Sequence, residues 1–83
     1  MAAQKELHVQ YYAAFREATG LSEETVRSAA GTAADLYQEL SRKHGISYGL
    51  SVLRVALNDH VVPWDTPVAD GDTVVFLAPF AGG

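Results

Sequence analysis

The sequence predicts an α+β fold, in which a mixed sheet of four to five strands carries one main helix across one face. Strand-like alternation of apolar and polar residues near both ends of the chain and helical spacing of apolar residues in its middle predict this arrangement. Apolar residues make up 48% of the 83 residues, which is enough for one core. We therefore expect a single domain over residues 1–83, with residues 78–83 as an extended C-terminal tail.

The first strand is predicted by a period of two, with one buried face made by Leu7, Val9 and Tyr11 and the other by His8, Gln10 and Tyr12. A loose start over residues 1–5 precedes it. Residues 15–20 have the pattern of a short helical turn that Gly20 ends. Residues 23–28 predict a second, weaker strand that pairs with the first.

The clearest helix opens at Thr32, a good N-cap residue, with Asp35 near the positive helix end. Its apolar face follows the spacing i, i+3, i+4, i+7 and consists of Ala33, Leu36, Tyr37 and Leu40. Cationic side chains complement the helix dipole in the last turn, and Gly45 is suited to end the helix.

After a connector over residues 46–51, residues 52–57 predict a strand, and Asn58-Asp59 predict a two-residue turn. Residues 60–62 would return antiparallel to that strand. A loop with two prolines then leads to the Asp70-Gly71 turn, where glycine accepts a positive φ.

Residues 73–78 are β-branched, aromatic and apolar and predict the last strand, at whose end Pro79 cannot donate a backbone hydrogen bond. This order fits a β-grasp arrangement with the first and last strands parallel in the middle. The face towards the helix would bury Leu7, Val9, Tyr11, Leu36, Leu40, Leu53, Val55, Leu57, Val74 and Phe76. The uncovered face would present Tyr12, Val75 and Leu77, which suggests a partner.

Composition excludes several classes of function. The chain has no cysteine, so disulfides, thiolate catalysis and cysteine-based metal sites are excluded. Its net charge of −4 with scattered basic residues argues against nucleic acid. The three histidines lack metal-ligand spacing, and no serine or threonine has an identifiable base. Without a membrane-spanning run or signal peptide, we expect a soluble, cytoplasmic protein with no metal and no bound cofactor.

The sequence closes on Gly82-Gly83, only a few residues beyond the last predicted strand. One interpretation is an ordinary frayed terminus or a cloning remnant. The functional interpretation is an α-carboxylate on a thin thread, which lacks Cβ atoms at both glycines and can enter a narrow channel. Residues 79–83 could extend about 17 Å from the domain.

Taken together, these segments resemble the small subunit of molybdopterin synthase, the MoaD-type sulfur carriers of the ubiquitin-like β-grasp group. The resemblance covers nearly the whole chain. Its stretches are residues 11–17 with Gly20, Thr32 leading to Leu36 and Leu40, residues 55–58, residues 67–72, and residues 74–76 running to Gly82-Gly83. The chain departs from the family at Ala78-Pro79, where two prolines are frequent, and at Leu77, where an aromatic residue is common.

The resemblance implies that an E1-like enzyme of the MoeB type uses ATP to adenylate the carboxylate of Gly83, which is then converted to a thiocarboxylate. It also implies that Gly82, which has no side chain, lets the tail enter the partner. It further implies a heterotetramer with a MoaE-type large subunit that holds the active site, where the sulfur is transferred to cyclic pyranopterin monophosphate. The residues implied to contact the partner are Tyr12, Val61, Val75, Leu77, Pro79, Phe80 and Ala81.

Three alternatives remain open from the sequence. A ThiS-like carrier for thiamine or cysteine synthesis would share the sulfur chemistry, and a ubiquitin-like modifier would be joined to lysines through Gly83. In a plain β-grasp interaction domain, the Gly82-Gly83 pair would have no function.

Overall fold

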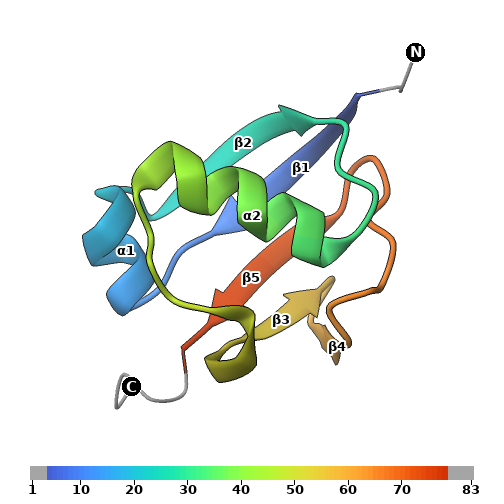
Figure 1. Ribbon diagram of the computed structural model, residues 1–83. Helices are drawn as coiled ribbons and strands as arrows, with labels where there is room; N and C mark the ends of the chain where they lie inside the picture. Colours follow the sequence, from blue (N-terminus) through green and yellow to red (C-terminus); the bar gives the residue numbers. More distant parts are fainter. Residues whose placement is uncertain (1–3, 79–83) are drawn as a thin grey trace.

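The computed structural model describes residues 4–78, which form one five-stranded sheet with a helix across one face (Figure 1). The strands are β1 (Lys5–Gln10), β2 (Glu23–Ser28), β3 (Arg54–Leu57), β4 (His60–Val62) and β5 (Thr73–Leu77). The helices are α1 (Ala14–Thr19), α2 (Ala33–His44) and the short 3-10 helix η1 (Leu50–Val52). The predictions for residues 79–83 of the tail concern a segment outside the described residues.

The strand order across the sheet is β2-β1-β5-β3-β4. The central strands β1 and β5 are parallel, whereas the β1–β2, β3–β5 and β3–β4 pairs are antiparallel. The turn between β3 and β4 consists of Asn58 and Asp59, both with positive φ, as a two-residue hairpin turn requires. This topology confirms the predicted β-grasp arrangement, including the parallel pair in the middle.

Helix α2 begins and ends where the sequence predicted. The Thr32 hydroxyl accepts a hydrogen bond from the backbone N–H of Asp35, and the Asp35 carboxylate accepts one from the N–H of Thr32. At the other end, Gly45 has a φ of 69°, the left-handed conformation typical of a helix C-terminus. The predicted apolar face is buried and packs against the sheet.

The core lies between α2 and the sheet. The ten side chains predicted for it, eight from the sheet side and two from the helix, are all buried. At one end of this core, Phe76 on β5 packs against Tyr37 of α2, with ring centroids 5.2 Å apart, and stacks on Trp64 at 6.1 Å. Trp64 thus packs inward from the proline-containing loop.

Several boundaries differ from the prediction. Val52 belongs to η1, not to a strand, because the N–H of Leu53 closes a tight turn on the carbonyl of Leu50; its side chain is 49% exposed. Lys5 lies in β1 opposite Ser28, so it is not part of a loose start. The strand β1 ends at Gln10, before the predicted Tyr11 and Tyr12, and β5 ends one residue before Ala78.

Candidate functional site

The uncovered face of the sheet carries the predicted contact residues that lie within the described chain. Along β5, Val74 and Phe76 are buried towards α2, whereas Val75 and Leu77 point to the opposite face and are half-buried. Val61 on the edge strand β4 is 65% exposed, and Tyr12 beyond the end of β1 is 51% exposed. These are the two most exposed large apolar side chains of residues 4–78.

The strand register brings these side chains together. Val75 lies opposite Gln10 on one side and Ala56 on the other, and Ala56 in turn lies opposite Val61. Directly opposite residues on one face of a sheet have Cβ atoms about 5 Å apart, so this row is continuous across four strands. The Tyr12 hydroxyl donates a hydrogen bond of 3.2 Å to the Gln10 side chain, which places Tyr12 at the end of the row.

We define the open-face patch as the apolar side chains Tyr12, Ala56, Val61, Val75 and Leu77. Sequence reasoning identified four of these residues but missed Ala56, whose small side chain gave no signal. Leu77, the last residue of β5, belongs to the patch. The described chain therefore leaves the sheet at the border of the open-face patch. The remaining predicted site residues, Pro79, Phe80, Ala81, Gly82 and Gly83, lie outside the described residues.

The other half of the uncovered face is polar and internally matched. Arg27 on β2 lies opposite Glu6 on β1. Next to them, the His8 ring nitrogen Nδ1 lies 3.2 Å from the hydroxyl oxygen of Thr25, within hydrogen-bond distance. This half resembles an ordinary solvated sheet surface, and the apolar half adjoins the strand end that leads to the tail.

A tight turn fixes the position of Tyr12. The N–H of Phe15 donates to the carbonyl of Tyr12 over 3.0 Å, and Ala13 between them has φ 48° and ψ −118°. These angles match the second position of a type II′ turn, where glycine is preferred because a Cβ is strained there. The strained backbone of Ala13 therefore lies directly beside an exposed side chain of the patch, which is typical of functional surfaces.

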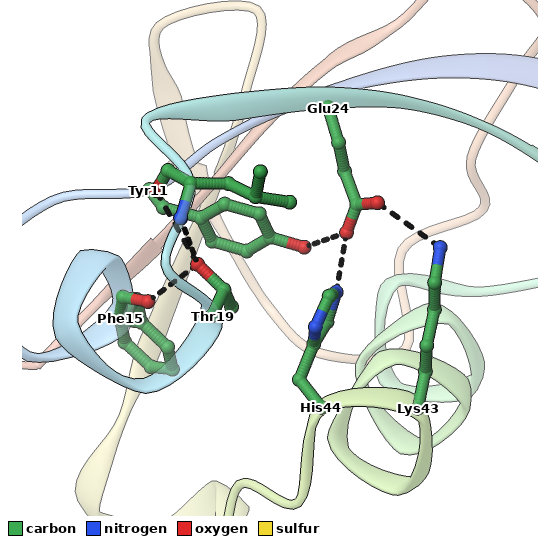
Figure 2. Close-up of polar contacts among 7 residues, drawn as sticks. Tyr11, Phe15, Thr19, Glu24, Lys43 and His44 are labelled. Atoms are coloured by element: carbon green, nitrogen blue, oxygen red, sulfur yellow. Dashed lines mark hydrogen bonds and ion pairs between the residues drawn. The ribbon is translucent and has the colours of Figure 1, made fainter.

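On the helix side, Tyr11 is held by a polar cluster that sequence reasoning missed (Figure 2). Its hydroxyl donates a 2.6 Å hydrogen bond to the Glu24 carboxylate on β2. The same carboxylate lies 2.6 Å from Nε2 of His44 and 3.0 Å from Nζ of Lys43, both in the last turn of α2. We call these four residues, Tyr11, Glu24, Lys43 and His44, the Glu24 cluster.

The electrostatics of the Glu24 cluster favour an ionised carboxylate. Partial burial of Glu24 opposes ionisation, but hydrogen bonds from Tyr11, His44 and Lys43 together hold its pKa below the ordinary value. Burial, followed by the contact with Glu24, raises the pKa of the Tyr11 hydroxyl, which therefore stays protonated as a donor. His44 thus connects α2 to β2, whereas His8 and His60 are exposed.

The Glu24 cluster has the geometry of a structural connection between β1, β2 and α2, because every polar group in it is engaged with another. Within residues 4–78, no group of three or more metal-binding side chains is close enough to hold an ion. No helix in that part of the chain is both long and apolar enough to cross a membrane. The chemical candidates are therefore the open-face patch and the tail that follows it in sequence.

Comparisons with known proteins agree with this arrangement. The family model of the ThiS family matches residues 9–83. A candidate subunit 1 of molybdopterin converting factor from Pyrococcus furiosus is similar in structure, with a TM-score of 0.73 and 28% identity over 87% of this chain and 94% of that one. Subunit 1 in the complex of subunits 1 and 2 of molybdopterin-converting factor from Helicobacter pylori 26695 gives a TM-score of 0.64 and 28% identity, over 94% of this chain and 99% of that one.

The small archaeal modifier protein 1 of Methanosarcina acetivorans has the same fold, with a TM-score of 0.77 and 20% identity over 96% of this chain and 98% of that one. The comparison with curated protein sequences gave no match. Since the family match covers most of the chain, the chain belongs to the ThiS family and has the ubiquitin-like β-grasp fold of the ThiS and MoaD-type proteins, as the sequence resemblance predicted.

Proposed function

We propose that this chain is the sulfur-carrier small subunit of molybdopterin synthase. In this proposal two successive transfers from a thiocarboxylate at Gly83 place two sulfur atoms on cyclic pyranopterin monophosphate and build the dithiolene of molybdopterin, and each transfer returns Gly83 to a carboxylate. The observation that carries the proposal is the open-face patch at the end of β5, the strand that leads towards Gly82-Gly83. Membership of the ThiS family and the likeness to subunit 1 of the Helicobacter pylori complex support it.

The proposed chemistry begins with activation of a poor electrophile. A MoeB-type enzyme transfers AMP from ATP to the Gly83 carboxylate and releases pyrophosphate. A sulfur donor then attacks the acyl carbon and displaces AMP, which leaves sulfur in place of one carboxylate oxygen. The thiocarboxylate is anionic near neutral pH and nucleophilic in the manner of a thiolate, so a chain without cysteine can carry reactive sulfur.

The proposed partner is a MoaE-type large subunit, joined in a heterotetramer, which supplies the catalytic side chains. The open-face patch would dock on it through Tyr12, Val61, Val75 and Leu77, and Pro79, Phe80 and Ala81 would line the path of the tail. Apolar side chains that are half exposed on a sheet face gain from burial at such an interface, at about 25 cal/mol per Å².

The absence of cysteine gives a direct test of sulfur loading. The chain is incubated with the activating enzyme, ATP and a sulfur source, then treated with a thiol-directed alkylating reagent. A thiocarboxylate is the one sulfur nucleophile that can form on this chain, so a singly alkylated protein, with the label mapped to the C-terminal peptide, supports the proposal. Alkylation also distinguishes loading from oxidation of Met1. The two changes cannot be told apart easily by intact mass, because adding one oxygen to Met1 and exchanging one oxygen for sulfur at Gly83 raise the mass by nearly the same amount.

A matched pair of extended chains provides the control. One extra alanine after Gly83 should prevent loading, because the new terminus has a Cβ and lies one residue too far. The same alanine added before Met1 should leave loading intact. Gly82→Val should also keep the fold and stop loading. A C-terminally extended chain that is still labelled would contradict the proposal.

The recipient of the sulfur separates the proposal from its alternatives. A ThiS-type carrier, which the family match also favours, would be loaded equally but would not convert cyclic pyranopterin monophosphate with the large subunit. A modifier would form isopeptide-linked adducts in cell extract. Conversion to molybdopterin by the loaded chain and its large subunit is the result that supports the first function.

A further inference from the structure

One cation at the edge of the open-face patch, Arg54, forms no ion pair with the carboxylates of the described residues 4–78. Arg54, the first residue of β3, lies opposite Leu77 of β5 in the strand register and on the same face as Ala56. Its side chain is exposed, and its Nη1 donates a 2.9 Å hydrogen bond to the carbonyl of Leu53. Arg54 therefore borders the end of β5 from which the tail continues.

Two other basic side chains, one on the same face of the sheet and one on α2, have an acidic residue opposite them or paired with them, which Arg54 lacks. Arg27 on the same face lies opposite Glu6, and Lys43 pairs with Glu24 on the other side of the sheet. Within residues 4–78, both ion pairs involve Glu24, and none involves Arg54. The cross-strand neighbour of Arg54 is instead the apolar Leu77.

Docking of a partner would remove water from around the Arg54 guanidinium. A partner that covers the open-face patch also removes water from the edge where Arg54 lies. Withdrawing an unpaired charge from water is costly, whereas a carboxylate placed opposite arginine can form paired hydrogen bonds. A partner with a neutral or basic residue at that point is disfavoured, and charge matching of this kind contributes more to the choice of partner than to raw affinity.

We propose that Arg54 is a partner-selecting residue, and that the large subunit that docks on the open-face patch presents a carboxylate to it. This inference rests on the proposed function, since it takes the large subunit as the partner. It adds the chemistry of the contact surface: apolar opposite Val61, Val75 and Leu77, and acidic opposite Arg54.

The test measures the dissociation constant of the full chain for its cognate large subunit by isothermal titration calorimetry. Arg54→Glu should weaken binding at least about tenfold, because it sets two carboxylates against each other. Arg54→Met, which keeps an apolar stem, should weaken it less, and its dissociation constant should depend less on salt than that of the unmodified chain. Arg27→Glu is the matched control with the same change of charge on the polar half of the same face, and it should change binding less than about threefold.

Further readouts separate recognition from folding. The melting temperature should be nearly the same for the two Arg54 variants, because Arg54 is exposed, and slightly lower for Arg27→Glu, which sets a second carboxylate opposite Glu6. Replacing the facing acidic residue of the large subunit with arginine should restore binding to Arg54→Glu. Equal effects of Arg54→Glu and Arg27→Glu would overturn the inference while leaving the proposed function standing.

Two other outcomes would also overturn the inference. If the unmodified chain does not bind the large subunit, the proposed function fails and the inference fails with it. If the chain instead forms a dimer that Arg54→Glu dissociates, the occupant of the face is a second copy of this chain.

Discussion

Replacing Glu24 with alanine should destabilise the domain far more than is usual for a residue on an edge strand such as β2. The change removes the acceptor of the Tyr11 hydroxyl, whose side chain is 0% exposed, and the contact with His44 at 2.6 Å. A hydrogen bond to a charged group contributes about 1.5–3 kcal/mol, and a buried donor left without an acceptor costs about 1–3 kcal/mol. The exposed Lys43 adds less than about 1 kcal/mol.

The expected loss is therefore about 3 kcal/mol, which for a domain of this size lowers the melting temperature by on the order of 15 °C. Glu24→Gln keeps one acceptor oxygen and should cost about 1 kcal/mol. Urea unfolding gives the free energies, with the fluorescence of Trp64 as a probe of the core, because this single tryptophan stacks on Phe76.

Glu23→Gln is the matched control, since Glu23 is exposed on the opposite face and should change stability by less than about 0.5 kcal/mol. A double-mutant cycle with Tyr11→Phe should give a coupling of about 1–2 kcal/mol between Tyr11 and Glu24. The reasoning would be refuted if Glu24→Ala destabilised no more than Glu23→Gln, or if the cycle gave no coupling.

The Glu24 cluster also sets a dependence on pH. The folded state lowers the pKa of Glu24 below its ordinary value of 4.5, so the unfolded chain takes up the proton more readily. The stabilisation by Glu24 is thus fully present above pH 4.5 and is lost as the pH falls through the folded pKa. The difference in unfolding free energy between the unmodified chain and Glu24→Gln should shrink on acidification below that pH. A difference that stayed constant would show that the charge of Glu24 contributes nothing.

Four further substitutions test three separate parts of the structure. Ala13→Gly should stabilise the domain by about 1 kcal/mol in urea unfolding, because glycine relieves the strain at φ 48°; Ala18→Gly in α1 is the control and should destabilise. Thr32→Ala removes the N-cap of α2 and should cost about 1 kcal/mol, and an unchanged melting curve would contradict the capping argument. Tyr12→Asp and Leu77→Asp should weaken binding to the large subunit and leave melting nearly unchanged; a large loss of stability would mean that these side chains belong to the core.

The elements with local signals could be predicted from the sequence. The ends of helix α2, between the N-cap Thr32 and Gly45, could be predicted because capping and left-handed geometry depend on residues within one turn of each end. The alternation along β5 likewise separated Val74 and Phe76 from Val75 and Leu77, since side chains on a strand point to opposite faces. These signals sufficed for the topology and for three of the five residues of the open-face patch, Tyr12, Val75 and Leu77, whereas Val61 was predicted only from the family resemblance.

Contacts between distant segments could not be predicted in the same way. Glu24 lies on β2, whereas Lys43 and His44 lie at the end of α2, and no local pattern shows that the helix end reaches that strand. The boundary at Val52 failed for a related reason. Val52 is β-branched, which favours a strand, but the hydrogen bond from the N–H of Leu53 to the carbonyl of Leu50 closes a turn that includes Val52.

The two faces of the sheet are connected at the end of β1. The Glu24 cluster holds the Tyr11 ring against the core, and the turn at Ala13 immediately follows Tyr12. Because successive residues of an extended chain point in opposite directions, fixing Tyr11 on the helix side also fixes where Tyr12 emerges on the other. A buried hydrogen-bond network thus orders an exposed side chain of the open-face patch before any partner arrives. Such preorganisation lowers the entropic cost of docking, because the side chain does not have to be ordered when a partner binds.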